Sequence, residues 1–176
     1  NQGNPGIVYA IRDTNNDGKA DEIIPIIRGL NQPNGVAFAQ GTLFVAEQNR
    51  ITRYNAIEDN LQSPPMGTVI MDGMLGSGNH QWRYIEFSQK EGKLYLAKGA
   101  PCNVCVPEAT YGSILRMNPD GSGVEVFAEG VRNSVGLAFH PGNGQLWFTD
   151  NGRDQMGDNV PSDELNHAPR AGMHFG

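Results

Sequence analysis

The sequence predicts an all-β fold that is rich in tight turns. Of its 176 residues, 23 are glycine and 11 are proline, without the three-residue period of collagen, and this composition is typical of short strands joined by turns. The apolar residues occur in short runs that are rich in β-branched and aromatic side chains and bounded by turn residues. No segment keeps the i, i+3, i+4 spacing of an amphipathic helix.

The first strands are expected on either side of a turn rich in Asp and Gly. Residues 6–13 form a short apolar run that enters this turn, and residues 23–27 form the run that follows it. The same arrangement returns later in the chain, with runs at 113–120 and 124–127. Each pair predicts two strands joined by a turn.

The next strands belong to a second repeat. Residues 29–38 and 41–47 match residues 130–139 and 144–150 in their glycines, an Ala-Phe pair and a second apolar run, and residues 84–87 and 92–97 form a weaker copy. The equivalent phenylalanines Phe38, Phe87 and Phe139 are separated by 49 and 52 residues.

Four short strands in about 50 residues is the size of one β-propeller blade. The sequence therefore predicts a β-propeller of four-stranded antiparallel blades, with about three to four blades present, and a small β-sandwich is the alternative. Since an unclosed ring leaves strand edges exposed, we expect residues 1–176 to be a partial propeller domain that is truncated at both ends.

Charge limits the partners that the chain can have. The net charge of −6 argues against nucleic acid, which needs a basic surface, and against docking on anionic lipid. No apolar run approaches the length that spans a membrane.

The turn after the first run is a candidate calcium loop. Asp13, Asn15, Asp17 and Asp21 place oxygen atoms at spaced positions around Gly18, which is typical of a turn that binds Ca²⁺. Since Asn, Asp and Gly are also the usual turn residues, a hairpin turn without metal is the alternative.

Two cysteines form a Cys102-Asn-Val-Cys105 motif. Its spacing fits a zinc half-site, a redox pair, a haem attachment site or a disulfide. Haem attachment needs a histidine at position 106, which is Val, and the chain has no second such motif for zinc. A disulfide is favoured, which implies an oxidising compartment, and two free thiols are the alternative.

Three further segments carry candidate functional residues. His80 stands in the loop before a predicted strand, where it could act as a general base or be an ordinary surface histidine. Arg132-Asn133 stand opposite Gln32-Pro33 in the repeat, and this change to a fixed cation indicates an anion contact or a surface arginine. An acidic loop from 150 to 166 contains Gly152, which can bring backbone carbonyls close to a cation, and a solvated acidic loop is the alternative.

Taken in order, these motifs resemble the pyrroloquinoline quinone (PQQ)-dependent soluble aldose dehydrogenases, also called glucose/sorbosone dehydrogenases. The resemblance runs through nearly the whole chain, and the Cys102–Cys105 loop is closer to the sorbosone-type branch. It is carried by the segments 35–38 with 43–47, 79–81, 132–139, 163–166 and 172–176. Where the glucose-type branch has an acidic residue after the strand that follows the base, this chain has Lys98-Gly99-Ala100.

The resemblance implies a six-bladed propeller that holds PQQ and Ca²⁺ and oxidises an aldose or aldehyde sugar in the periplasm or outside the cell. It implies that His80 is the general base toward the sugar C1 hydroxyl, that Arg132 and Asn133 contact the cofactor, and that the Gly152 and Arg153 carbonyls bind Ca²⁺. A calcium-binding propeller without enzymatic activity and a propeller lactonase are the alternatives. If the enzyme interpretation is right, we expect His80, Arg132 and the two carbonyls to converge on one end of the propeller axis.

Overall fold

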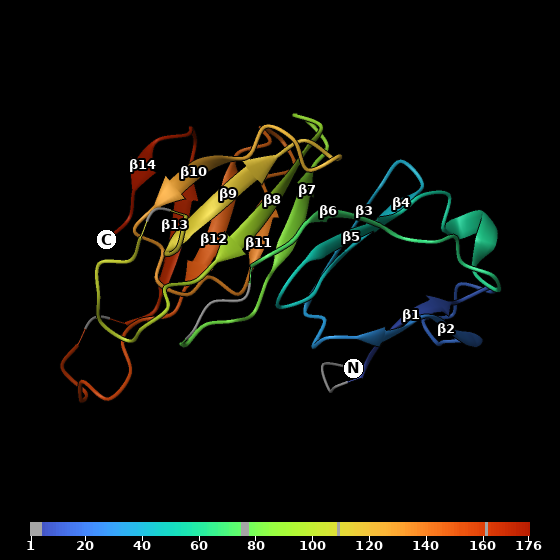
Figure 1. Ribbon diagram of the computed structural model, residues 1–176, viewed down its shortest axis with the longest axis horizontal. Coiled ribbons are helices and arrows are strands. Elements are labelled where there is room, and N and C mark those ends of the chain that lie inside the picture. Colours follow the sequence, from blue (N-terminus) through green and yellow to red (C-terminus); the bar gives the residue numbers. More distant parts are fainter. Residues whose placement is uncertain (1–4, 75–77, 109, 161) are drawn as a thin grey trace.

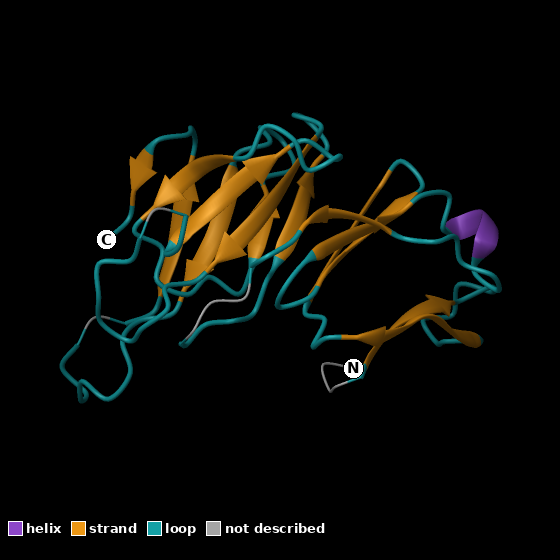
Figure 2. Ribbon diagram, viewed as in Figure 1, coloured by secondary structure: helices purple, strands orange, loops and turns teal. Residues whose placement is uncertain are grey.

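The computed structural model describes residues 5–74, 78–108, 110–160 and 162–176. Figures 1 and 2 show strands in consecutive sheets that follow one another along the molecule. Within the described residues the only helix is a single 3₁₀ turn, η1 (Glu58–Asn60), so the all-β prediction is confirmed. The described part of the chain has no helix with the length and apolar character needed to cross a membrane.

The first two sheets are antiparallel and follow the order of the sequence. A two-stranded sheet pairs β1 (Gly6–Arg12) with β2 (Glu22–Leu30). A four-stranded blade follows, with the order β3 (Gly35–Ala39), β4 (Thr42–Ala46), β5 (Ile51–Tyr54) and β6 (Thr68–Met71). Runs of β-branched and aromatic residues between turns form these strands, as their composition predicts.

The next blade contains four antiparallel strands and one added strand. Its order is β7 (Ile85–Ser88), β8 (Lys93–Lys98), β9 (Ser113–Met117) and β10 (Glu125–Glu129), with β14 (Met173–His174) parallel to β10. The last sheet contains β11 (Leu137–Phe139), β12 (Leu146–Asp150) and β13 (Glu164–Ala168). The chain is therefore a β-propeller with blades of the predicted kind.

Residues 164–167 correct one expectation. We expected Glu164, Leu165 and Asn166 in an acidic loop, but together with His167 they lie in β13, which pairs with β12. The His167 ring stacks on Trp147 with 4.5 Å between ring centroids. Cross-strand pairing with β12 decides this element, because its own residues are too polar to indicate a buried strand.

The hydrophobic core lies between neighbouring blades. One cluster joins the β3–β6 blade to the β7–β10 blade, with Phe44 stacked near Phe87. A second cluster joins the β7–β10 blade to the last sheet, with Tyr95 packed edge-on against Phe139. A third joins the β1–β2 sheet to the β3–β6 blade. Each sheet thus buries its faces against the next one, which is how sheets are stabilised.

The strands β3, β7 and β11 open their blades and pack against one another in sequence. Gly35 makes the first of these contacts possible, because a Cβ atom at this position would overlap the carbonyl oxygen of Arg83 and lie 2.8 Å from the backbone nitrogen of Ile85. The starts of β3 and β7 meet at Gly35, and the segments before β7 and β11 meet at Gly99, which lies against both His80 and Arg132. The loops that precede them therefore meet at one end, and these loops carry the candidate site.

Candidate functional site

Three equivalent positions lie in the loops that precede β3, β7 and β11. Asn31, His80 and Arg132 each lie seven residues before the phenylalanine of their blade. The backbone N–H of Asn31 donates to the Glu47 carboxylate (2.6 Å), and that of Arg132 donates to the Asp150 carboxylate (2.8 Å). The equivalent of Arg132 is therefore Asn31, and the sequence match with Gln32 was wrong by one residue.

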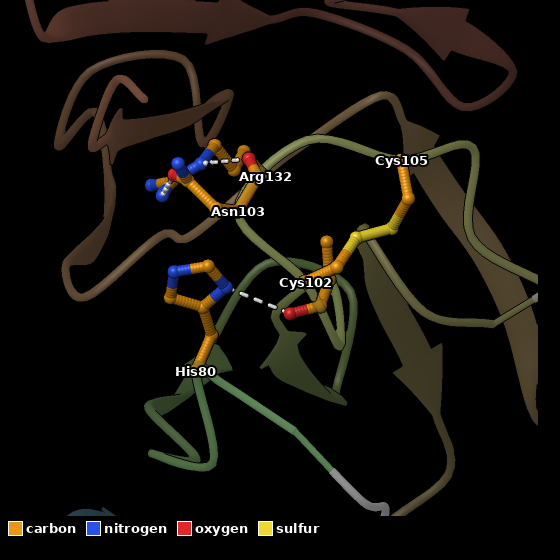
Figure 3. Close-up of a disulfide and its surroundings, with 6 residues drawn as sticks. His80, Cys102, Asn103, Cys105 and Arg132 are labelled. Carbon is orange, nitrogen blue, oxygen red and sulfur yellow. Dashed lines mark hydrogen bonds between the residues drawn. A yellow bond between two sulfur atoms is a disulfide. The ribbon is translucent and has the colours of Figure 1, made fainter. Parts of the chain in front are cut away.

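His80 is oriented by a carbonyl group. Its Nδ1 lies 2.7 Å from the carbonyl oxygen of Ala100, and a carbonyl only accepts hydrogen bonds, so Nδ1 carries the proton. In the neutral ring Nε2 therefore keeps a free lone pair, which is what a general base needs. Figure 3 shows this second nitrogen turned away from the carbonyl oxygen, with Asn103 and Arg132 beside the ring.

The residues 99 and 100 connect His80 to Arg132. The backbone N–H of Ala100 donates to the carbonyl oxygen of Arg132 (2.8 Å), so one residue binds both. Gly99 lies so close to them that a Cβ atom there would be 2.6 Å from the Cβ of His80 and 3.3 Å from the Arg132 oxygen. The structure thus brings His80 and Arg132 together at one end of their blades.

The Arg132 guanidinium ties two loops together. Nε donates to the Asn103 carbonyl oxygen (3.0 Å) and Nη1 to the Asn151 carbonyl oxygen (3.0 Å). Nη2 donates to Asn103 Oδ1 (2.6 Å) and to the carboxylate of Asp154 (2.8 Å). An arginine has five N–H donors, so these four contacts within the described chain leave one for a ligand.

The Asp150 carboxylate binds the backbone of both Arg132 and Asn133. One oxygen accepts from the backbone N–H of Arg132 and the other from that of Asn133 (2.6 Å). The carboxylate is buried, with 7% of the residue exposed, and this burial raises its pKa although the two amide hydrogen bonds oppose the change. Asn133 also accepts from the backbone N–H of Asn151 (3.2 Å) through its carbonyl.

The predicted cation ligands lie beside Arg132. Gly152 and Arg153 line a cavity of about 250 Å³ together with Arg132, Asp150 and Glu164. The carbonyl of Asn151 before them accepts from Arg132 and that of Asp154 after them from Asn103. In the described chain the Gly152 and Arg153 carbonyls accept no hydrogen bond, so they have free lone pairs of the kind that Ca²⁺ prefers.

The 13–21 turn is organised by hydrogen bonds. The Asp13 carboxylate accepts from the backbone N–H groups of Asp17 (3.2 Å) and Gly18 (2.8 Å), and Asp21 accepts from the backbone N–H of Thr14 (2.7 Å). Asn15 and Asp17 accept from backbone N–H groups two residues later, as Asx turns do. The described residues contain no group of three His, Cys, Asp or Glu side chains placed to hold a metal. These hydrogen bonds are those of a hairpin turn, and calcium binding by the turn stays a prediction.

Cys102 and Cys105 form a disulfide, as the sequence favoured (Figure 3). The described residues include no free cysteine, so the zinc and free-thiol alternatives find no support. The loop that the disulfide closes presents Asn103 to Arg132.

Sequence reasoning gave no role to two cations, Arg83 and Lys98. Arg83 is 1% exposed and donates to the carbonyl oxygens of His80 (3.1 Å) and Met74 (2.9 Å). Lys98 occupies the repeat position of Glu47 and Asp150, and its Nζ lies 3.8 Å from the centroid of the Tyr111 ring. Burial lowers the pKa of both groups. Neither forms an ion pair with a described carboxylate. The match of residues 92–97 with 41–46 and 144–149 already places Lys98 at this position, but sequence reasoning gave it no role.

A family model described as a domain of unknown function (DUF7133) matches residues 1–174. An uncharacterized protein of Borreliella burgdorferi is 30% identical over 167 residues, which cover 90% of this chain and 44% of that protein. The chain thus spans less than half the length of this curated relative.

Solved structures with the same fold include enzymes and a binding protein. The holo form of the pyranose dehydrogenase PQQ domain from Coprinopsis cinerea has a TM-score of 0.76 at 17% identity, over 94% of this chain and 47% of that one. A calcium structure of a Trichoderma reesei protein of Carbohydrate-Active Enzymes family AA12 has a TM-score of 0.74 at 18% identity, over 92% and 46%. A nidogen/laminin complex has a TM-score of 0.64 at 19% identity, over 93% and 55%. At these identities the likeness concerns the fold alone.

Proposed function

The chain belongs to the family of the domain of unknown function DUF7133, and we propose that it is part of an oxidoreductase that oxidises an aldose or aldehyde sugar with PQQ and Ca²⁺. The observation that carries the proposal is the placement of His80 and Arg132 on either side of Ala100, with no described residue hydrogen-bonded to His80 Nε2. A proton acceptor and a fixed cation on one side of a propeller suit an alcohol that loses a proton beside an anionic cofactor.

The described residues fit these two groups. The one N–H that Arg132 keeps can meet a carboxylate or quinone oxygen, with Asn133 supporting it through the shared contacts to Asp150. The Gly152 and Arg153 carbonyls, which accept no hydrogen bond in the described chain, suit Ca²⁺. When bound, PQQ and Ca²⁺ supply a hydride acceptor and a Lewis acid.

His80 performs the proton transfer in this proposal. Nε2 removes the proton from the sugar C1 hydroxyl, while the Nδ1–H bond to Ala100 keeps the ring oriented and in the required tautomer. Arg83 supports this geometry, because it binds the carbonyl oxygen of His80 from inside the blade.

We further propose that the chain is part of a six-bladed ring in a periplasmic or secreted protein. The match over 47% of the pyranose dehydrogenase PQQ domain supports a larger propeller. The Cys102–Cys105 disulfide supports an oxidising compartment. We expect the substrate to be a small sugar, with no nucleic-acid or membrane partner.

The test uses the full-length protein with PQQ and calcium chloride and follows sugar-dependent reduction of a dye. We expect reduction only when both are added, and His80→Gln should lower kcat by about 10²- to 10⁴-fold, the usual contribution of a general base, while PQQ still binds. Gln145→Ala, which removes the partner of His167 on the far side of β12, is the control. If no aldose or aldehyde sugar reduces the dye, the proposed dehydrogenase activity is rejected.

A binding module without catalysis is the second candidate. Two observations favour it: the same fold occurs in a nidogen/laminin complex, and four of the five Arg132 donors are used within the described chain. Failure of PQQ to bind in the experiment above would favour this candidate. The propeller lactonase needs a metal held by carboxylates, and the described residues contain no such group.

A further inference from the structure

We infer that Asn103 is a positioning residue, which holds Arg132 and the 151–154 segment in the arrangement that the cofactor site requires; this inference rests on the proposed function. Asn103 is the second residue of the disulfide loop. Nothing in its sequence context distinguishes it from an ordinary turn asparagine. Its hydrogen bonds to Arg132 and Asp154 distinguish it from such a residue.

Both polar atoms of the Asn103 side-chain amide form hydrogen bonds. Nδ2 donates to the carbonyl oxygen of Asp154 (3.0 Å), and Oδ1 accepts from the backbone N–H of the same residue (2.9 Å). The side chain thereby pairs with the backbone of Asp154 as a neighbouring strand would. Oδ1 also accepts from Nη2 of Arg132 (2.6 Å), and the Asn103 carbonyl accepts from Nε.

The disulfide restricts the position of Asn103. Cys102 and Cys105 close a ring that contains Asn103 and Val104, and Ala100 just before it binds both His80 and Arg132. Figure 3 shows His80, Asn103 and Arg132 gathered on one side of this loop. One short segment therefore contacts the proposed base, the proposed cofactor cation and the 151–154 segment with its proposed calcium ligands.

The orientation of the Gly152 and Arg153 carbonyls depends on these contacts. Arg132 holds the carbonyl of Asn151 before them, and Asn103 holds both backbone groups of Asp154 after them. If the Asn103 side chain is removed, Asp154 loses two backbone contacts, and Arg132 Nη2 keeps only the Asp154 carboxylate. Removal of residues that orient metal ligands typically weakens metal affinity or activity by about 10- to 100-fold.

The experiment compares Asn103→Ala with Asn118→Ala in the full-length protein. Asn118 is a matched control, because its side chain also bridges a turn, to Lys93 and Ser122, but at the opposite end of the blade. Two quantities are measured: hydrogen exchange of the Asp154 amide without cofactor, and the dissociation constant of PQQ with calcium chloride, followed by fluorescence. We expect faster exchange and at least about tenfold weaker PQQ binding in Asn103→Ala alone, with the KM for sugar unchanged.

The two measurements separate the inference from the proposed function. If the wild-type protein does not bind PQQ, the proposed function fails, and the exchange of Asp154 still reports whether Asn103 holds this segment. If PQQ binds the wild type and Asn103→Ala equally, or if Asp154 exchange is unchanged, the inference is overturned. If Asn103→Ala does not fold, Asn103→Ser, which keeps a short polar turn residue, is measured in the same way and decides by the same outcomes.

Discussion

Replacement of Gly99 by alanine is the sharpest test of the packing between His80 and Arg132. The new Cβ atom would lie 2.6 Å from the Cβ of His80 and 3.1 Å from its carbonyl oxygen. Carbon atoms pack at about 3.5–4.0 Å, so His80 or the 99–100 segment must move by roughly 1 Å. Gly99 does not have a positive φ, so the effect of the substitution is steric.

This displacement has two measurable consequences. Overpacking of this kind costs about 1–3 kcal/mol, which urea unfolding at equilibrium measures as a lower midpoint. A shift of about 1 Å in a catalytic group can lower the rate by about 10²-fold, which the dye-reduction assay measures. Two-dimensional NMR of the histidine rings reports the movement of His80 independently of any activity.

Gly136→Ala is the matched control for Gly99→Ala. Gly136 also lacks a positive φ, but a Cβ atom there would make an ordinary contact 3.4 Å from Oγ1 of Thr149. We expect the free energy of unfolding of this variant to lie within about 0.5 kcal/mol of that of the wild type, as for most surface substitutions. If Gly99→Ala has the same unfolding midpoint and the same His80 resonances as the wild type, the close packing of these residues is refuted.

Two further substitutions test the groups beneath the site. Arg83→Leu removes the hydrogen bonds to the carbonyl oxygens of His80 and Met74. Because these buried acceptors lose their partner, the variant should be destabilised by about 3 kcal/mol. A urea unfolding midpoint equal to that of the wild type would contradict this expectation. Asp150→Asn tests the carboxylate, whose pKa is raised in the folded protein by burial. A raised pKa means that its contribution to stability is full at pH values below its unfolded pKa and is lost as pH rises through the folded pKa. Urea unfolding from pH 3 to pH 7 should therefore show the wild type losing stability relative to Asp150→Asn as pH rises, and a difference that stays constant with pH would count against a raised pKa.

The strands and the blade repeat could be predicted from the sequence. The runs at 35–38, 43–47, 84–87 and 146–150 all contain strands, because alternating or continuous apolar residues between turns are a local signal. The strand β13 was missed, because Glu164, Leu165 and Asn166 carry no apolar pattern and pair with β12 only in the folded chain. The repeat comparison located Arg132 but paired it with Gln32, one residue after its equivalent Asn31.

The sequence by itself determined the all-β class, the blade length and the residue types available for chemistry, since turn residues and strand periodicity act over a few neighbours. Only the tertiary structure decided what those residues do. It used four of the five Arg132 donors inside the protein and placed Asn103 between Arg132 and Asp154. These outcomes depend on contacts between loops about 20 to 50 positions apart in the chain, and such contacts form only when the packed blades bring the ends of their strands together.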